Sequence, residues 1–117
     1  MESISSDVIR GCIDLMILRV LWDGDSYGYE ISRRITAISG QRYCMKETTL
    51  YSAFARLEKL GALHSYPGKY SGGRERTYYA LTDTGRQQYR QKCTEWALTK
   101  ELIANFILKK EDIDGRH

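Results

Sequence analysis

The side chains best suited to chemistry lie close together in residues 46–60. They are hydroxyl groups and cations, which form hydrogen bonds with phosphate oxygens and with the edges of bases. The candidates are Lys46, Thr48, Thr49, Tyr51, Ser52 and Arg56. The opposite, apolar face of the same helix would consist of Leu50, Phe54 and Leu57. A helix of this kind favours contact with a nucleic acid, although an ordinary solvated helix face has similar residues.

A second cluster of cations surrounds a glycine-containing turn. Lys69, Arg74 and Arg76 flank the segment Tyr70-Ser71-Gly72-Gly73. A glycine turn that carries cations can follow a phosphate backbone closely. A charged turn also serves solubility, but together with the face at 46–60 it favours double-stranded DNA as the partner.

Catalysis has little support in the sequence. The histidines are His64 and His117, and no nucleophile, base and acid arrangement or phosphate-binding loop is visible. Cys12, Cys44 and Cys93 are odd in number and form no Cys-x-x-Cys pair, so neither disulfides nor a metal site is indicated. Cys44 could react with oxidants, or it could be a small apolar residue. We expect no enzyme, no cofactor and no metal.

Composition sets limits without identifying a function. A net charge of +3 in 117 residues is too small to indicate a nucleic-acid partner by itself. The N-terminus lacks the basic start of a signal peptide, and no apolar run reaches the length of a membrane span. We expect a cytoplasmic protein without a membrane anchor.

The elements that must position these residues follow from the apolar periodicity and from the turn residues. The pattern predicts helices over Asp7–Trp22, Tyr27–Ile38 and Lys46–Leu60, strands over Leu63–Lys69 and Arg74–Leu81, and a helix from Thr82 to about Lys110. The fold class is mainly α with a two-stranded β wing. This order is that of a winged helix-turn-helix, in which the helix at 46–60 enters the major groove.

The predicted C-terminal helix is too long for the domain before it. Its apolar residues form two stripes, which the small N-terminal part cannot both cover. One stripe contains Tyr89, Cys93, Trp96, Ile103 and Ile107, and the other contains Leu98, Leu102 and Phe106. We therefore expect a DNA-binding domain over residues 1–81 and a dimerisation helix with its tail over 82–117.

Three motifs resemble the PadR-like family of transcriptional regulators. They are Tyr27-Gly28-Tyr29-Glu30-Ile31, the segment Thr49-Leu50-Tyr51 followed by Arg56-Leu57-Glu58-Lys59-Leu60-Gly61, and Tyr78-Tyr79-Ala80-Leu81-Thr82-Asp83-Thr84-Gly85-Arg86. The short C-terminal part with its mid-helix Trp96 is similar to a multidrug-responsive subfamily. The resemblance implies a homodimer formed through the first and last helices, phosphate contacts from Tyr51 and Thr49, and a wing at residues 69–76. Lys46 departs from the better helix caps of relatives, so it leaves the helix start less fixed or holds a phosphate itself.

The same resemblance implies an apolar pore near Trp96 at the dimer axis. An indole there could stack on a small aromatic or cationic effector, with Met16, Leu15, Cys12 and Ile103 as walls. Alternatively, Trp96 only fills the dimer core. Asp14, Glu95 and Lys100 either adjust the charge of such a pore or are solvated helix residues.

The sequence thus predicts a transcriptional regulator, most simply a repressor that binds a pseudo-palindromic operator whose half-sites lie roughly 34 Å or a multiple apart. A winged-helix module that binds another protein is the rival from a different class. The residues do not specify the operator sequence, the regulated gene or the effector. They also do not specify whether the protein represses or activates transcription.

Overall fold

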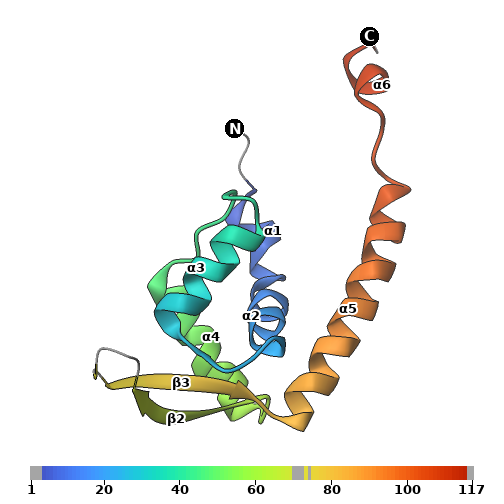
Figure 1. The fold of residues 1–117 in the computed structure, drawn as a ribbon. Coiled ribbons are helices and arrows are strands. Elements are labelled where there is room, and N and C mark those ends of the chain that lie inside the picture. The colour runs from blue at the N-terminus through green and yellow to red at the C-terminus, as the bar shows by residue number, and fades with distance from the viewer. Residues whose placement is uncertain (1–3, 70–72, 74, 116–117) are drawn as a thin grey trace.

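A small sheet lies at one end of a group of helices, and one long helix extends away from both (Figure 1). The computed structural model describes residues 4–69, 73 and 75–115. The helices are α1 (Ser6–Arg10), α2 (Ile13–Trp22), α3 (Gly28–Ile38), α4 (Glu47–Lys59), α5 (Asp83–Ala104) and α6 (Lys110–Asp114). The strands are β1 (Ser26–Tyr27), β2 (Leu63–Lys69) and β3 (Glu75–Leu81). This confirms the mainly helical fold class with a β wing. No helix in the described ranges has the length and apolar character needed to cross a membrane.

The predicted first helix is in fact two helices, so the expectation of one continuous helix over Asp7–Trp22 was wrong. Gly11 ends α1, and the Cys12 N–H then donates to the Ile9 carbonyl at 2.8 Å in a tight turn. Glycine is a poor residue for a helix interior, which is why the break falls there. After the break, α2 buries Ile13, Ile17, Leu18, Val20 and Leu21 in the core.

The core lies between α2, α3, α4 and the sheet. In α4 the buried residues are Leu50, Ala53, Phe54 and Leu57, which confirms the predicted apolar face. The Phe54 ring stacks on Tyr79 of β3 with 3.9 Å between the ring centroids. This packing fixes the rotation of α4 about its axis, and it therefore fixes which side chains α4 turns outward.

The predicted hairpin is present, but the sheet has a third strand that the sequence analysis missed. β3 pairs with β2 from Leu63↔Leu81 to Lys69↔Glu75, and on its other side with β1. The strand order is β1-β3-β2, all antiparallel. Residues 70–72 and Arg74 lie outside the described residues. A strand of two residues is too short to show the alternation by which a strand is predicted from sequence.

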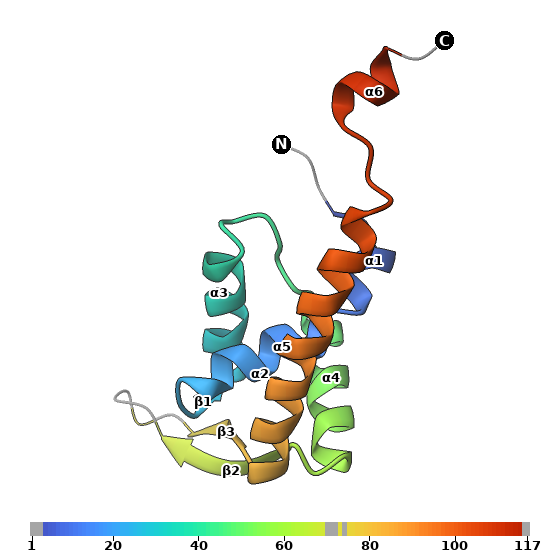
Figure 2. The same ribbon diagram turned by 90° about the vertical axis from the view of Figure 1, so that its right-hand side faces the viewer.

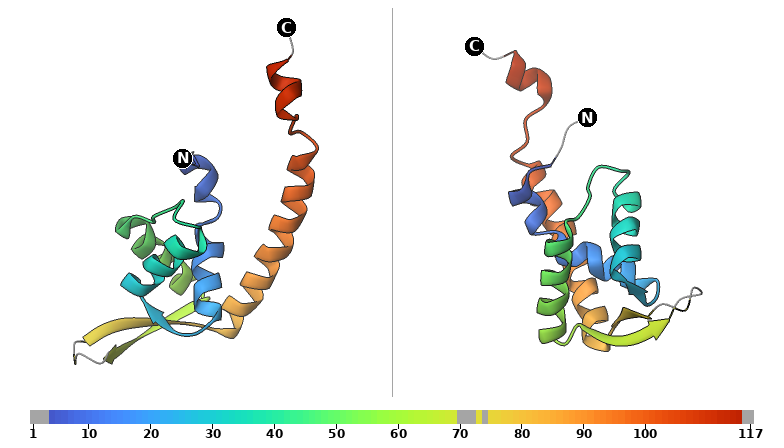
Figure 3. Two further views of the ribbon diagram at one scale, coloured as in Figure 1. Left: turned by 45° about the horizontal axis from the view of Figure 1, so that its top comes forward. Right: turned by 90° about the vertical axis from the view of Figure 1, so that its left-hand side faces the viewer.

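The last helix begins where the sequence predicts and ends earlier. The Thr82 hydroxyl accepts from the Gly85 N–H at 3.0 Å and so caps the N-terminus of α5. The helix ends at Ala104 rather than near Lys110. Asn105 keeps helical backbone angles, but its N–H donates to the Leu102 carbonyl, three residues back rather than four, and this bond closes the last turn. Figures 2 and 3 show that α5 passes alongside α2 and that its C-terminal end leads away from the other helices toward α6.

A shared carboxylate links α2 and α3. Asp23, at the end of α2, pairs with Arg19 at 2.8 Å and with Arg34 of α3 at 2.6 Å. Hydrogen bonds from Arg34 and Arg19 lower the pKa of Asp23 below its ordinary value. The carboxylate stays ionised at neutral pH and links the end of α2 to α3 at the surface, while the buried core packing holds the two helices together.

Candidate nucleic-acid interface

Helix α4 turns a hydroxyl-bearing face outward. Thr48 and Ser52 are exposed and Thr49 is half-buried, on the side of α4 away from its apolar face. Small side chains allow a helix backbone to approach a groove floor, and hydroxyls bond both phosphates and base edges. In the arrangement of α3 and α4 as a helix-turn-helix pair, α4 is the second helix, which is the one that reads DNA.

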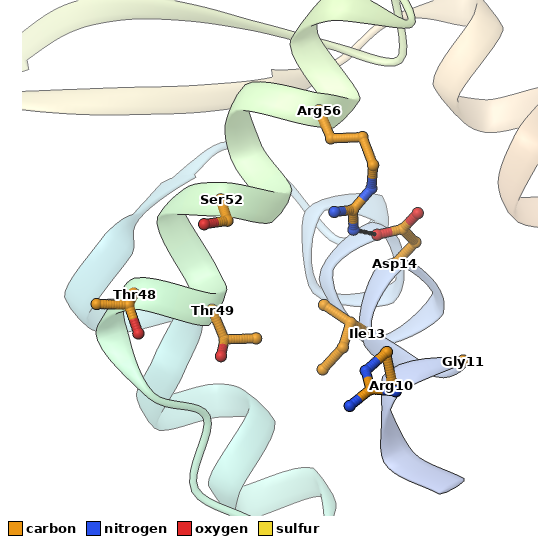
Figure 4. Close-up of a pocket in the computed structure, with 8 residues that line it drawn as sticks. All are labelled: Arg10, Gly11, Ile13, Asp14, Thr48, Thr49, Ser52 and Arg56. Atoms are coloured by element: carbon orange, nitrogen blue, oxygen red, sulfur yellow. Dashed lines mark hydrogen bonds and ion pairs between the residues drawn. The ribbon is translucent and has the colours of Figure 1, made fainter. Parts of the chain in front are cut away.

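A groove of about 500 Å³ separates α4 from α1 and α2 (Figure 4). One wall carries residues predicted from the sequence as DNA contacts, namely Thr48, Thr49, Ser52 and Arg56. The other wall consists of Arg10, Gly11, Ile13 and Asp14. Sequence reasoning missed Arg10, because it lies at least 37 positions from α4 in the chain and only the fold brings it near.

Arg56 reaches across this groove to Asp14. A guanidinium nitrogen of Arg56 donates to a carboxylate oxygen of Asp14, and Figure 4 shows the two side chains pointing toward one another. The Asp14 side chain is 20% exposed and the Arg56 side chain 50%. The structure therefore places Asp14 beside α4.

Tyr51 rests on a glycine of the preceding helix. Its side chain is 45% exposed and meets the Phe54 ring edge-on at 5.3 Å. A Cβ added at Gly28 would overlap the Tyr51 hydroxyl and lie 2.9 Å from the adjacent ring carbon. The glycine in the Tyr27-Gly28-Tyr29 motif thus leaves the space in which the Tyr51 ring lies.

Gly28→Ala is expected to move the Tyr51 hydroxyl and weaken DNA binding about two- to tenfold per reading helix, the equivalent of one lost hydrogen bond. Fluorescence anisotropy with a labelled promoter duplex measures the change, and circular dichroism checks the fold. Tyr51→Phe serves as the control, because it removes the hydroxyl and keeps the ring. If Gly28→Ala costs as much affinity in the Tyr51→Phe background as it does alone, its effect does not pass through the Tyr51 hydroxyl.

Two cations of the wing differ in their exposure and contacts. Lys69 is exposed at the end of β2, whereas Arg76 lies over the Tyr27 ring with 4.4 Å between its guanidinium carbon and the ring centroid. Arg74, also predicted as a contact, lies outside the described residues. Tyr66 and Tyr78 stack across the hairpin at 5.7 Å. These ring contacts stiffen the part of the wing from which the cations extend.

Lys46 occupies the N-terminal cap position of α4. Its backbone is extended there, and its side chain makes no capping hydrogen bond. The first turn of α4 therefore has no side-chain cap from Lys46, and the exposed ammonium lies beside the positive end of the helix dipole. Both features suit a phosphate at this end of the helix.

The structure brings three of the five predicted ligand-binding residues into a second groove. This groove, of about 440 Å³, lies between α2, α3 and α5, and is lined by Leu15, Met16, Arg19, Ile35, Ile38, Ser39, Tyr89, Cys93, Trp96, Ala97 and Lys100. Of the predicted set, Leu15, Met16 and Trp96 line it. Cys12 lies beside α1, where burial raises the pKa of its thiol, and Ile103 is 48% exposed on α5.

An outward hydroxyl face on the second helix of a helix-turn-helix pair, together with a cationic wing on the adjoining sheet, defines the winged-helix class of DNA-binding proteins. The chain belongs to the PadR-like family of transcriptional regulators, whose family model matches residues 17–91. Members of this family regulate transcription and are not enzymes.

Solved structures and a curated sequence are similar over most of the chain. A transcriptional regulator from Clostridium thermocellum is 55% identical, with a TM-score of 0.82, over 90% of this chain and 99% of that one. A PadR family transcription regulator from Clostridium difficile is 35% identical, with a TM-score of 0.71, over 82% of this chain and 98% of that one. An uncharacterized protein of Lysinibacillus sphaericus is 41% identical over 89% of this chain and 95% of its own length.

Proposed function

We propose that the protein represses transcription by binding a pseudo-palindromic operator as a homodimer. The outward face of α4 is the observation that carries the proposal, since its hydroxyl groups are exposed while the opposite face is buried. In a two-fold dimer, two such helices would occupy major grooves roughly 34 Å or a multiple apart. A regulator bound there blocks transcription by occupancy.

Exposed apolar side chains on α5 and on the segment after it support the homodimer. Residues 82–117 would supply this contact, as the sequence predicts. The exposed apolar residues are Leu98, Leu102, Ile103, Phe106, Ile107 and Leu108. A contiguous exposed apolar surface is costly in water and is typical of a protein interface. A second copy, with the same stripe related by two-fold symmetry, covers it most simply.

The groove beside Trp96 supports release by a small aromatic ligand. Trp96 and Tyr89 offer ring surfaces, and Leu15 and Met16 offer apolar contact. Lys100 is cationic, Arg19 is already paired with Asp23, and the described lining itself contains no carboxylate. Charge complementarity therefore favours an uncharged or anionic aromatic effector over a cationic one. Binding there would alter the geometry between the two reading helices.

The alternative hypothesis, a winged-helix module that binds only protein, is no longer favoured. It rested on the fold alone, whereas the family to which the chain belongs consists of transcriptional regulators. Binding that falls steeply with salt would distinguish DNA from an apolar protein contact.

Tyr51→Ala and Arg56→Ala are each expected to weaken operator binding about two- to tenfold per reading helix, since each removes one contact to DNA. Anisotropy titrations of a labelled duplex from the DNA upstream of the chain's own gene, at two salt concentrations, measure this. Gln87→Ala, an exposed position near the start of α5, is the matched control. Wild-type affinity in both variants would refute the assignment of α4 as the reading helix.

A further inference from the structure

The pair formed by Asp14 and Arg56 is the one described ion pair that ties α2 to α4. Of the other ion pairs within the described ranges, one lies within α1. The other two join Asp23, at the end of α2, to Arg19 of the same helix and to Arg34 of α3. A partly exposed ion pair stabilises a fold very little. Its place at one end of the groove beside the reading helix indicates a part in DNA recognition (Figure 4).

The two partners differ in how freely they can move. Asp14 is largely covered and lies in the first turn of α2, next to the buried Ile13. Arg56 extends on a long side chain from the flank of α4, and half of that side chain is exposed. The carboxylate is therefore the fixed partner, and it determines where the guanidinium lies.

A guanidinium held in this way keeps donors for a second partner. Arginine carries five N–H donors in a planar fork, and one terminal nitrogen bonds Asp14. The remaining donors lie on the half-exposed side chain, in the groove that Thr49 and Ser52 also line. A guanidinium that Asp14 holds in place presents its remaining N–H donors to a guanine edge in one orientation. A guanidinium without this partner can turn and bond any nearby phosphate.

We propose that Asp14 is a positioning residue that makes Arg56 selective for its operator contact. With Asp14 present, the bound carboxylate fixes the orientation of the Arg56 guanidinium, so that it can contact one base or phosphate and cannot reach the others. Without Asp14, the guanidinium is free to pair with any phosphate in reach. This inference rests on the proposed binding of an operator by α4.

Asp14→Asn keeps the size of the side chain and removes its charge. We expect the ratio of operator affinity to non-operator affinity to fall about fivefold or more, since a well-placed arginine contact discriminates between base pairs by at least that factor. We also expect the slope of log K against log salt on non-operator DNA to steepen by about one per reading helix, because Arg56 becomes free to bind a phosphate. Asp14→Glu, which restores the charge, should recover part of the ratio.

Anisotropy titrations with a footprinted promoter duplex and with a scrambled duplex of equal length and composition measure both quantities. The decisive comparison repeats Asp14→Asn in an Arg56→Gln background, where the substitution should leave the affinity ratio unchanged. Asp112→Asn is the matched control, since it removes an exposed carboxylate on α6, which lines neither groove.

Two outcomes would overturn the inference. One is an unchanged affinity ratio in Asp14→Asn. The other is an equal fall in the ratio in the Arg56→Gln background, which would mean that Asp14 acts only as a nearby negative charge. If the wild-type protein itself shows no preference for the promoter duplex, the proposed operator binding fails instead, and this result is separate from both.

Discussion

Gly85→Ala is expected to destabilise the protein by about 2–3 kcal/mol, although alanine is ordinarily the better residue in a helix. Gly85 lies in the first turn of α5, directly against the backbone that enters β2. A Cβ there would overlap the Ala62 carbonyl oxygen and lie 3.0 Å from the Ala62 carbonyl carbon and from a methyl of Leu81. The Ala62 backbone lies on one side of the added Cβ and the Leu81 side chain on the other. The overlap can therefore be relieved only by moving α5 away from the sheet, which disrupts packing.

Thermal unfolding followed by circular dichroism measures this effect, and a melting temperature lower by roughly 10 °C is expected. Thr84→Ala is the matched control, because Thr84 is exposed in the same turn of α5 and should change stability little. A Gly85→Ala variant as stable as the wild type would mean that α5 can move away from the turn at Ala62 without loss.

Leu102→Glu is expected to dissociate the proposed homodimer and to reduce operator affinity about 10²–10⁴-fold, the gain that linking two binding modules ordinarily gives. Leu102 is 57% exposed in the single chain, so the substitution removes little from the fold of one subunit. At a two-fold interface, however, it would bury two carboxylates in apolar surroundings, which is strongly unfavourable.

Analytical ultracentrifugation and anisotropy with the same promoter duplex test the two parts of this result. Gln87→Glu adds the same charge at an exposed position in the first half of α5 and should leave both measurements unchanged. A Leu102→Glu protein that remains dimeric would place the contact between subunits elsewhere than on this stripe of α5.

Local patterns in the sequence were enough to predict most elements of the fold. Leu50, Phe54 and Leu57 recur at helical spacing, so the burial of one face of α4 and the exposure of Thr48 and Ser52 followed directly. The cap at Thr82 is equally local. Where the prediction was wrong, a single residue outweighed the periodicity: Gly11 breaks the first helix, and Asn105 ends α5.

The candidate site could be predicted only in part, because its contacts join distant segments. The residues of one helix face were identifiable, but the partner of Arg56 lies 42 positions away on α2. Asp14 has no neighbour in sequence that indicates this contact. The space that Gly28 leaves for Tyr51 is similarly a result of how α3 crosses α4, and helical periodicity carries no information about it.

Strand β1 ties the wing to the start of α3. Its pairs Ser26↔Tyr79 and Tyr27↔Tyr78 are held by backbone hydrogen bonds, and these cannot slide without breaking. We therefore expect the helix-turn-helix pair and the wing to move together. In the proposed homodimer, an effector that leaves this unit intact would release DNA by changing the distance or angle between its two copies. The length of DNA covered within each half-site would stay constant, while tolerance to the spacer between half-sites would change.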